Sequence, residues 1–149
     1  MTLKLYLDTE FNSHGGELIS IALAGSDDSK FYAVAPLPEP IKIHPWVSEN
    51  VIPKLYREPE HIELLRKRLQ EYLLSREGCE IYADWPADFQ HLMELMCGPH
   101  YADSFMIDCS MILLRSTEPK SEIPHNAIHD AVALRDWHQS TGLQKRKKG

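Results

Sequence analysis

The sequence lacks the features that define several protein classes. Its three cysteines, Cys79, Cys97 and Cys109, are widely spaced and form no Cys-x-x-Cys pair. This usage argues against a disulfide framework or a zinc knuckle, and it fits a reduced protein of the cytoplasm. The longest apolar run, residues 18–24, is interrupted by Ser20 and is too short to span a membrane. We therefore expect no membrane partner, and the charged N-terminal segment predicts no signal peptide.

The sequence also lacks an excess of positive charge. Lysine and arginine total 16 against 22 acidic residues, which gives a formal net charge of −6. A nucleic-acid substrate is not excluded, because four acids that bind divalent cations would account for most of that charge. No glycine-rich loop with a Lys-Ser/Thr pair is present, which argues against a P-loop enzyme.

Three segments near the N-terminus have the pattern of β-strands. They are residues 3–12, 17–24 and 30–35, and turn-forming residues separate them. Successive strands joined by short turns typically pair as an antiparallel meander. We therefore predict a three-stranded antiparallel sheet at the start of the chain.

The remainder of the chain alternates between predicted helices and strands. Apolar residues at helical spacing, with proline at the start and glycine at the end, predict helices. We expect helices at residues 59–76, 86–97 and 126–140, strands at 79–83 and 105–109, and a short apolar helix at 111–114. This order predicts an α/β fold in which a single mixed β-sheet is flanked by helices.

Two segments depart from this pattern. Residues 36–53 contain five prolines together with Trp46, so we expect a structured surface excursion without regular helix or central strand. Residues 143–149 are strongly basic and are expected to form a disordered tail, or else an arm that attracts phosphate. The chain is therefore predicted to comprise one domain, residues 1–142, followed by this tail.

Asp8 and Glu10 lie at the end of the first predicted strand. Alternate side chains of a strand share a face, so the two carboxylates project together. Carboxylates held this close repel each other and lose hydration, so such a pair binds a cation or keeps a proton. Hard divalent cations prefer clustered oxygen ligands. Two unrelated acids at an exposed strand end are the alternative.

Further candidates for the same site occur later in the chain. Asp88 lies in the first turn of the second predicted helix, where the helix dipole alone would also favour a carboxylate. Asp84 either caps this helix or supports the metal-binding residues. Asp130 lies early in the last helix, and His125 lies in the loop before it, from which it can turn back towards Asp130. His91 is expected at the surface.

Together these acids supply what a two-metal site requires. Two divalent ions about 4 Å apart need bridging and terminal carboxylates. One ion lowers the pKa of a water that attacks a phosphodiester, and the other stabilises the leaving oxygen. A neutral histidine such as His125 can accept the proton of that water. The predicted catalytic residues are Asp8, Glu10, Asp88, Asp130 and His125.

Three motifs formed by these residues occur in the order found in one group of nucleases. They are Asp8-Thr-Glu10, Asp84-Trp-Pro-Ala-Asp88 and His125-x4-Asp130. With them the sequence resembles the DEDD 3'–5' exonucleases of the RNase H-like superfamily, in the His-bearing branch called DEDDh, although many relatives carry Asn at the position of Asp84. More narrowly, the chain is similar to the RNase AS group of bacterial exoribonucleases, which prefer adenylate-rich RNA, through segments such as residues 6–11, 17–21, 32–34 and 51–55.

The resemblance implies an RNase H-like fold, dependence on Mg²⁺ or Mn²⁺, and a homodimer. It assigns the four acids as ligands of two divalent cations and His125 as the general base. The predicted function is hydrolysis of single-stranded RNA from its 3' end. A 3'–5' exodeoxyribonuclease of the same fold is one alternative, because sugar choice depends on few contacts with the 2'-OH. A non-catalytic nucleic-acid-binding module is another, against which the intact acids and histidine argue.

Two aromatic residues are candidates for substrate binding. Phe11 directly follows the first motif, where it would stack on the terminal base or, as the alternative, pack in the core. Base–aromatic stacking contributes about 1–3 kcal/mol per base, enough to matter at a site that holds one or two nucleotides. Trp85 is the second candidate for substrate contact.

Overall fold

A five-stranded mixed sheet forms the centre of the chain in the computed structural model, which describes residues 1–115 and 121–148, with side chains described up to Thr141. The strands are β1 (Lys4–Phe11), β2 (Leu18–Gly25), β3 (Lys30–Val34), β4 (Cys79–Ala83) and β5 (Cys109–Leu113), in the spatial order β3-β2-β1-β4-β5. The first three strands pair antiparallel, whereas β4 and β5 run parallel to β1. The predicted α/β class with a single mixed sheet is confirmed, and the arrangement is consistent with an RNase H-like fold.

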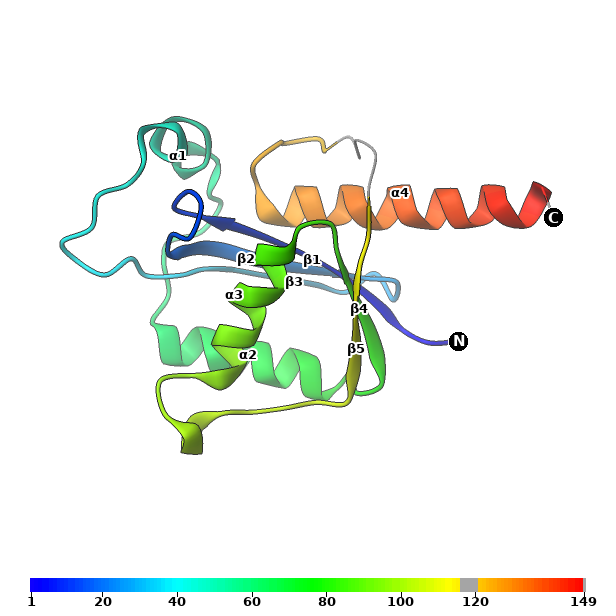
Figure 1. Cartoon of the computed structure of the whole chain (residues 1–149), viewed down its shortest axis with the longest axis horizontal. Helices are drawn as coiled ribbons and strands as arrows, with labels where there is room; N and C mark the ends of the chain where they lie inside the picture. The colour runs from blue at the N-terminus through cyan, green and yellow to red at the C-terminus, as the bar shows by residue number, and fades with distance from the viewer. Residues whose placement is uncertain (116–120, 149) are drawn as a thin grey trace.

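Helices cover both faces of this sheet (Figure 1). The helices α2 (Ile62–Leu74) and α3 (Pro86–Cys97) pack on one face, and α4 (Ala127–Lys148) packs on the other. The start and end of α3 follow from local signals, because Pro86 occupies the first helical position and Gly98 ends the helix with φ 68°. Among the described residues, no helix is both long and apolar enough to cross a membrane.

The alternation of side chains along β1 decides which residues face each layer. Leu5 and Leu7 are fully buried in the larger core, beneath α2 and α3. Tyr6 points to the other face, where it packs with Tyr82 and with Leu134 of α4. The even-numbered Asp8 and Glu10 therefore project towards α4.

Small residues let α4 approach the sheet closely. Ala127 and Ala131 are fully buried against Ala22 and Ala24 of β2. The side chains of these four alanines are single methyl groups, so helix and strand can pack closely. The first turns of α4 therefore lie near the end of β1. This contact brings Asp130 to the face that carries the acids of β1.

The prediction for residues 105–114 was wrong. Residues 109–113 form strand β5, which pairs parallel with β4 from Cys79 opposite Cys109 to Ala83 opposite Leu113. A short apolar run has no periodicity that separates a strand from a buried helical turn. Pairing with the free edge of β4 decides the conformation, and this non-local contact has no signature within the run itself.

The proline-containing excursion also differs from the prediction. It contains a helix, α1 (Pro45–Asn50), followed by the short 3₁₀ turn Ile52–Lys54. Proline is tolerated in the first turn of a helix, so Pro45 starts α1 rather than preventing it. At the other end of the chain, the backbone of α4 continues to Lys148, beyond the predicted end near residue 140. The domain boundary at residue 142 and the disordered tail stay predictions.

Two adjacent leucines of α2 offer a test of this layering. Leu65 is fully buried and Leu64 is 51% exposed. Leu65→Ala should lower the free energy of unfolding by roughly 2–5 kcal/mol, because it removes buried methyl groups and leaves a cavity. Leu64→Ala makes the same chemical change at the surface and should stay within about 0.5 kcal/mol of the parent. Urea titrations of both variants measure this, and equal losses would contradict the placement of α2.

Candidate active site

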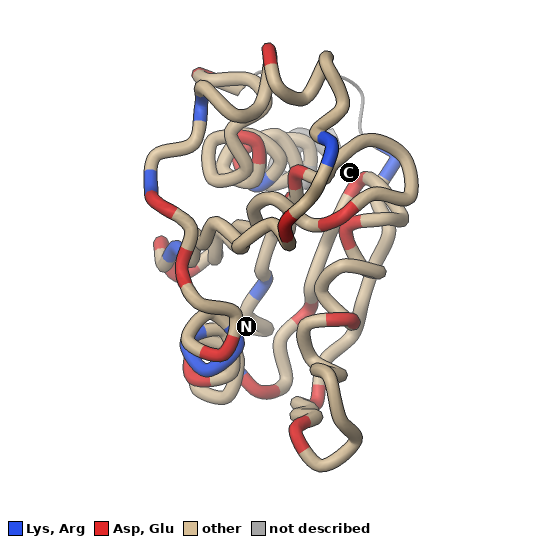
Figure 2. Tube along the Cα trace, turned by 90° about the vertical axis from the view of Figure 1, so that its left-hand side faces the viewer, with Lys and Arg blue, Asp and Glu red and all other residues tan. Residues whose placement is uncertain are grey.

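Carboxylates from three separate elements converge at the end of β1. One oxygen each from Asp8, Asp84 and Asp88 lie within 4.8 Å of one another, and the same holds for Asp8, Glu10 and Asp130. Asp8 belongs to both groups. Figure 2 shows several acidic positions near the middle of the molecule, and others around its periphery together with the lysines and arginines. The structure thus brings together all four acids that the sequence singles out, and Asp84 lies beside them, as one of its two sequence-based alternatives expects.

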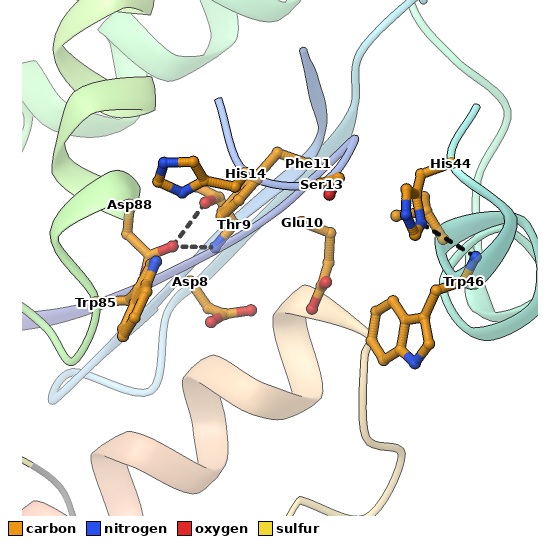
Figure 3. A pocket seen from close by; sticks show the side chains of 11 residues that line it. Asp8, Thr9, Glu10, Phe11, Ser13, His14, His44, Trp46, Trp85 and Asp88 are labelled. Carbon is orange, nitrogen blue, oxygen red and sulfur yellow. Dashed lines mark hydrogen bonds between the residues drawn. The ribbon is translucent and has the colours of Figure 1, made fainter. Parts of the chain in front are cut away.

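Hydrogen bonds between β1 and α3 position Asp88. The Thr9 hydroxyl donates to Asp88 Oδ1 at 2.6 Å, and the Thr9 backbone N–H donates to the same oxygen at 3.3 Å (Figure 3). Thr9 lies between Asp8 and Glu10, so its own side chain points to the α3 side of the sheet. Asp88 is thereby fixed to the strand that carries the other acids, and its Oδ2 is left for another partner. The dipole of α3 is not its only stabilising contact.

His125 turns back towards Asp130, as the loop position predicted. Its backbone N–H donates to Asp130 Oδ2 at 3.1 Å. Its φ of 68° lies in the left-handed region, which is unusual for a residue with a side chain. Asn126 supports this turn, because it is fully buried and its Oδ1 accepts a hydrogen bond from the His129 N–H at the start of α4.

The acids of this site hold their protons more tightly than ordinary carboxyls. Burial, followed by the charges of Asp88 and Glu10, holds the pKa of Asp8 well above its usual range. Burial and the neighbouring Asp130 raise the pKa of Glu10 to about 8. Burial raises the pKa of Asp88 to about 7 against the opposing effect of the Thr9 hydrogen bonds, and it also raises the pKa of Asp130. The charged state of this cluster therefore requires positive charge from elsewhere.

The donor set fits hard divalent cations. Asp8 Oδ2 and Asp88 Oδ2 are buried and have no hydrogen-bond partner among the residues that the structure describes. Buried carboxylate oxygens without a donor are costly, and a cation would satisfy them. All candidate ligand atoms are carboxylate oxygens, the type that Mg²⁺ and Mn²⁺ prefer. Because Asp8 belongs to both groups, it is suited to bridge two ions.

A pocket of about 480 Å³ opens beside the acids. Phe11, Trp46 and Trp85 line it together with Asp8, Glu10 and Asp88. Figure 3 shows the two tryptophans on opposite sides of the acids. Trp85, which the sequence analysis names as a candidate for substrate contact, lines this pocket and is 57% exposed. The pocket offers aromatic surface next to metal-binding oxygens.

Phe11 was expected either to stack on the terminal base or to pack in the core, and its position has features of both. It is half-buried, lines the pocket and packs on His91, with ring centroids 5.0 Å apart. His91 itself is buried, which corrects its expected surface position, and burial lowers the pKa of its imidazole. A register shift between Glu10 and Phe11 in the pairing of β1 with β2 ends the regular alternation at this point.

Sequence reasoning missed several residues of the site. Thr9 gave no signal, because its role depends on a hydrogen bond to α3. Trp46 and His44 line the pocket from the excursion, where only the presence of a tryptophan in a polar, proline-containing segment hinted at a role. Lys54 lies close enough for its charge to lower the pKa of Glu10. Asp84 does not cap α3, whose N-cap residue is Trp85.

Comparisons with known proteins agree with this geometry. No family model matches the chain. Two curated proteins from two strains of Mycobacterium tuberculosis, each named as a 3'-5' exoribonuclease, are 32% identical to it over 100 aligned residues. The aligned region covers 60% of this chain and 58% of each relative, so the match spans less than two thirds of the relatives' length. The similarity therefore relates part of this chain to part of each exoribonuclease.

The raised pKa values predict how stability depends on pH. Unfolded carboxyls ionise near pH 4, whereas Asp88 and Glu10 in the folded chain keep their protons until about pH 7 and about pH 8. The folded chain binds more protons across this interval, so its stability is highest below it and falls as pH rises through it. In EDTA, we expect the free energy of unfolding to decrease by a few kcal/mol between pH 5 and pH 8. Thermal and urea unfolding measure this.

Asp88→Asn provides the matched control, because it keeps the side-chain shape and removes one titrating group. The decrease between pH 5 and pH 8 should be smaller in this variant. Mn²⁺ at pH 8 should restore stability to the parent protein. A parent protein and an Asp88→Asn variant with the same pH dependence in EDTA would contradict the raised pKa of Asp88.

Proposed function

We propose that the chain is a 3'–5' exoribonuclease that removes nucleotides from the 3' end of single-stranded RNA with two divalent cations. One observation carries the proposal: two clusters of three carboxylates have Asp8 in common, and they lie next to a histidine and an aromatic pocket. The names of the two partial relatives support the same reaction and polarity.

The residues of the site have distinct roles in this proposal. Asp8, Glu10 and Asp130 would hold one cation, and Asp8 and Asp88, with Asp84 beside them, would hold the other. Such cations supply Lewis acidity that lowers the pKa of a water and stabilises the leaving oxygen. His125 accepts the proton of the attacking water. The hydrogen bond from its backbone N–H to Asp130 holds the peptide of His125 beside the acid cluster.

The pocket suits one end of a single strand. Its volume of about 480 Å³ falls in the range of small-molecule sites, which admits a nucleotide and excludes a duplex. Phe11 and Trp85 present aromatic surface on which a base stacks without dependence on its sequence. Preference for adenylate-rich RNA, a homodimer and a cytoplasmic location complete the proposal. The resemblance to the RNase AS group supports the first two, and the free cysteines Cys79, Cys97 and Cys109 support the third.

An exodeoxyribonuclease is the second candidate, because the same acids and base serve either sugar. No observed contact marks the position of a 2'-OH. The two candidates separate on one measurement, the relative rates on RNA and DNA of the same sequence. A non-catalytic binding module would instead bind the strand and leave it intact.

The first experiment follows the strand from its 5' label. Oligo(A), mixed-sequence RNA and the matching DNA, each labelled at the 5' end, are incubated with the protein in Mg²⁺ or in EDTA. We expect a ladder of products that shorten from the 3' end, with RNA degraded faster than DNA and oligo(A) fastest. Asp8→Ala should abolish the ladder, because it removes the acid common to both carboxylate groups.

Other results of this degradation experiment would each favour a different function. Faster loss of DNA would replace the ribonuclease by a deoxyribonuclease, and equal rates on all RNA sequences would remove the adenylate preference. Strand binding without cleavage would establish the binding module. A ladder that persists in EDTA would contradict the role of the cations.

A second experiment tests the role of His125. His125→Ala should lower kcat by about 10²–10⁴-fold, the usual contribution of a general base, while the affinity for Mn²⁺ measured by calorimetry stays close to that of the parent. His100→Ala removes an exposed histidine that follows the C-terminal end of α3, whereas Asp88 lies in the first turn of that helix, so this variant should keep full activity. Loss of Mn²⁺ affinity in His125→Ala would make His125 a metal ligand instead.

A further inference from the structure

The excursion that carries α1 is firmly attached to the rest of the protein. We call residues 36–55 the α1 arm. The Asn12 side chain donates to the Lys42 carbonyl at 3.0 Å and accepts from the His44 N–H at 2.8 Å. Val47 and Val51 of the arm are buried against Ile19 of β2. The arm is therefore a fixed wall beside the acids.

A second attachment joins the arm to the segment that carries His125. The buried Asn126 side chain donates to the Lys54 carbonyl at 2.8 Å. The same side chain caps α4 through its other end, at His129 N–H. Asn126 directly follows His125, so the end of the arm and the predicted general base are positioned by one residue.

Trp46 connects the arm to His125 a second time, through their rings. The ring centroids lie 4.9 Å apart with the planes at 83°, an edge-to-face arrangement. Trp46 is 49% exposed and lines the pocket opposite Trp85 (Figure 3). The indole is thus in contact with His125 and is also open to whatever enters the pocket.

The backbone of His125 is fixed, but its ring needs a separate support. The hydrogen bond to Asp130 and the left-handed φ hold the peptide of His125. Neither feature fixes the side-chain torsion angles that orient the imidazole. The imidazole itself contacts the indole of Trp46.

We propose that Trp46 is a positioning residue, which holds the His125 imidazole in place when a nucleotide base packs against the indole. This inference rests on the proposed exonuclease function. A base in the pocket restricts Trp46, and the restricted indole restricts the imidazole. Substrate binding and the orientation of the general base are then coupled through one side chain of the α1 arm.

Trp85 provides a matched control for this proposal. It lines the same pocket and is similarly exposed, at 57% against 49%. It lies at the start of α3, on the other side of the acids. Replacing either tryptophan removes aromatic surface from the pocket, and only the replacement of Trp46 removes a ring from His125.

The test measures kcat and KM on oligo(A) for Trp46→Ala, Trp46→Phe and Trp85→Ala, each with and without His125→Ala. Trp46→Ala should lower kcat at least tenfold, and Trp46→Phe should recover most of the loss because it restores an aromatic ring. Trp85→Ala should raise KM with little change in kcat. In the His125→Ala background, Trp46→Ala should no longer lower kcat, whereas Trp85→Ala should still raise KM.

Two outcomes would overturn the proposal. A Trp46→Ala variant that changes KM alone would make Trp46 part of the pocket wall only. Losses in kcat that multiply in the double variant with His125→Ala would show that Trp46 acts independently of the base. Thermal unfolding of each variant confirms that the fold is kept, which the exposure of both tryptophans favours.

A readout without catalysis separates this inference from the proposed function. The ring protons of His125, assigned with His125→Ala, are followed by NMR in the Mg²⁺-loaded protein. Trp46→Ala should shift these signals and Trp85→Ala should not, because the indole of Trp46 contacts the imidazole edge-to-face and Trp85 lies on the other side of the acids. Adenosine monophosphate should move them in the parent and not in Trp46→Ala. His125 signals that are identical in the parent and in Trp46→Ala would overturn the contact, whereas absence of nuclease activity with these shifts present would overturn only the exonuclease.

Discussion

The repulsion among the carboxylates at the end of β1 is the constraint on which the rest of this structure depends. Asp8 has acidic neighbours in two directions, and within the described part of the chain its buried Oδ2 has no hydrogen-bond partner. Like charges held this close in a partly dry site raise one another's pKa, as Glu10 and Asp88 show with values of about 8 and about 7. A chain selected for stability alone would separate these groups. Their convergence is a local cost, which a retained proton or a bound cation would reduce.

The stabilising contacts that offset this cost lie away from the acids. On one face, the core beneath α2 and α3 includes fully buried leucines of β1. On the other face, α4 is anchored at two places on either side of Asp130. Its first turns pack through alanines on β2, and further along the Tyr6 hydroxyl and His138 Nδ1 form a hydrogen bond of 2.6 Å beside the stacked ring of Tyr82. A helix held at both places keeps its acid in position against electrostatic repulsion.

Local signals in the sequence were sufficient to predict those features that depend on neighbouring residues alone. Pro86 and Gly98 defined both ends of α3, and the spacing of Asp8 and Glu10 defined their common face. These signals were insufficient where contact with a residue far away in the sequence determines the conformation or role of a segment. Strand β5 exists because β4 offers a free edge, and α1 exists because Val47 and Val51 find a buried surface on β2. Thr9 has its role only because α3 places Asp88 against it.

The convergence of the acids could be anticipated from the sequence, whereas the contacts around them could not, and the reason is physical. Clustered acids and a histidine have few uses together in a protein, so their presence on separate elements already restricts the chemistry. Aromatic residues have many uses, so Trp46 gave no specific signal until its ring was seen against His125.

The acids and the aromatic residues of the site belong to different parts of the fold. The acids belong to the sheet and its helices, where a shift of position would disturb buried core. The aromatic wall opposite Trp85 belongs to the α1 arm, which is joined to the remainder by side chains such as Asn12 and Asn126. Under the proposed function, substitutions in the arm would alter which nucleotide is accepted and how His125 is held without moving the carboxylates. The layers would then set the proposed chemistry, and the arm would set its selectivity.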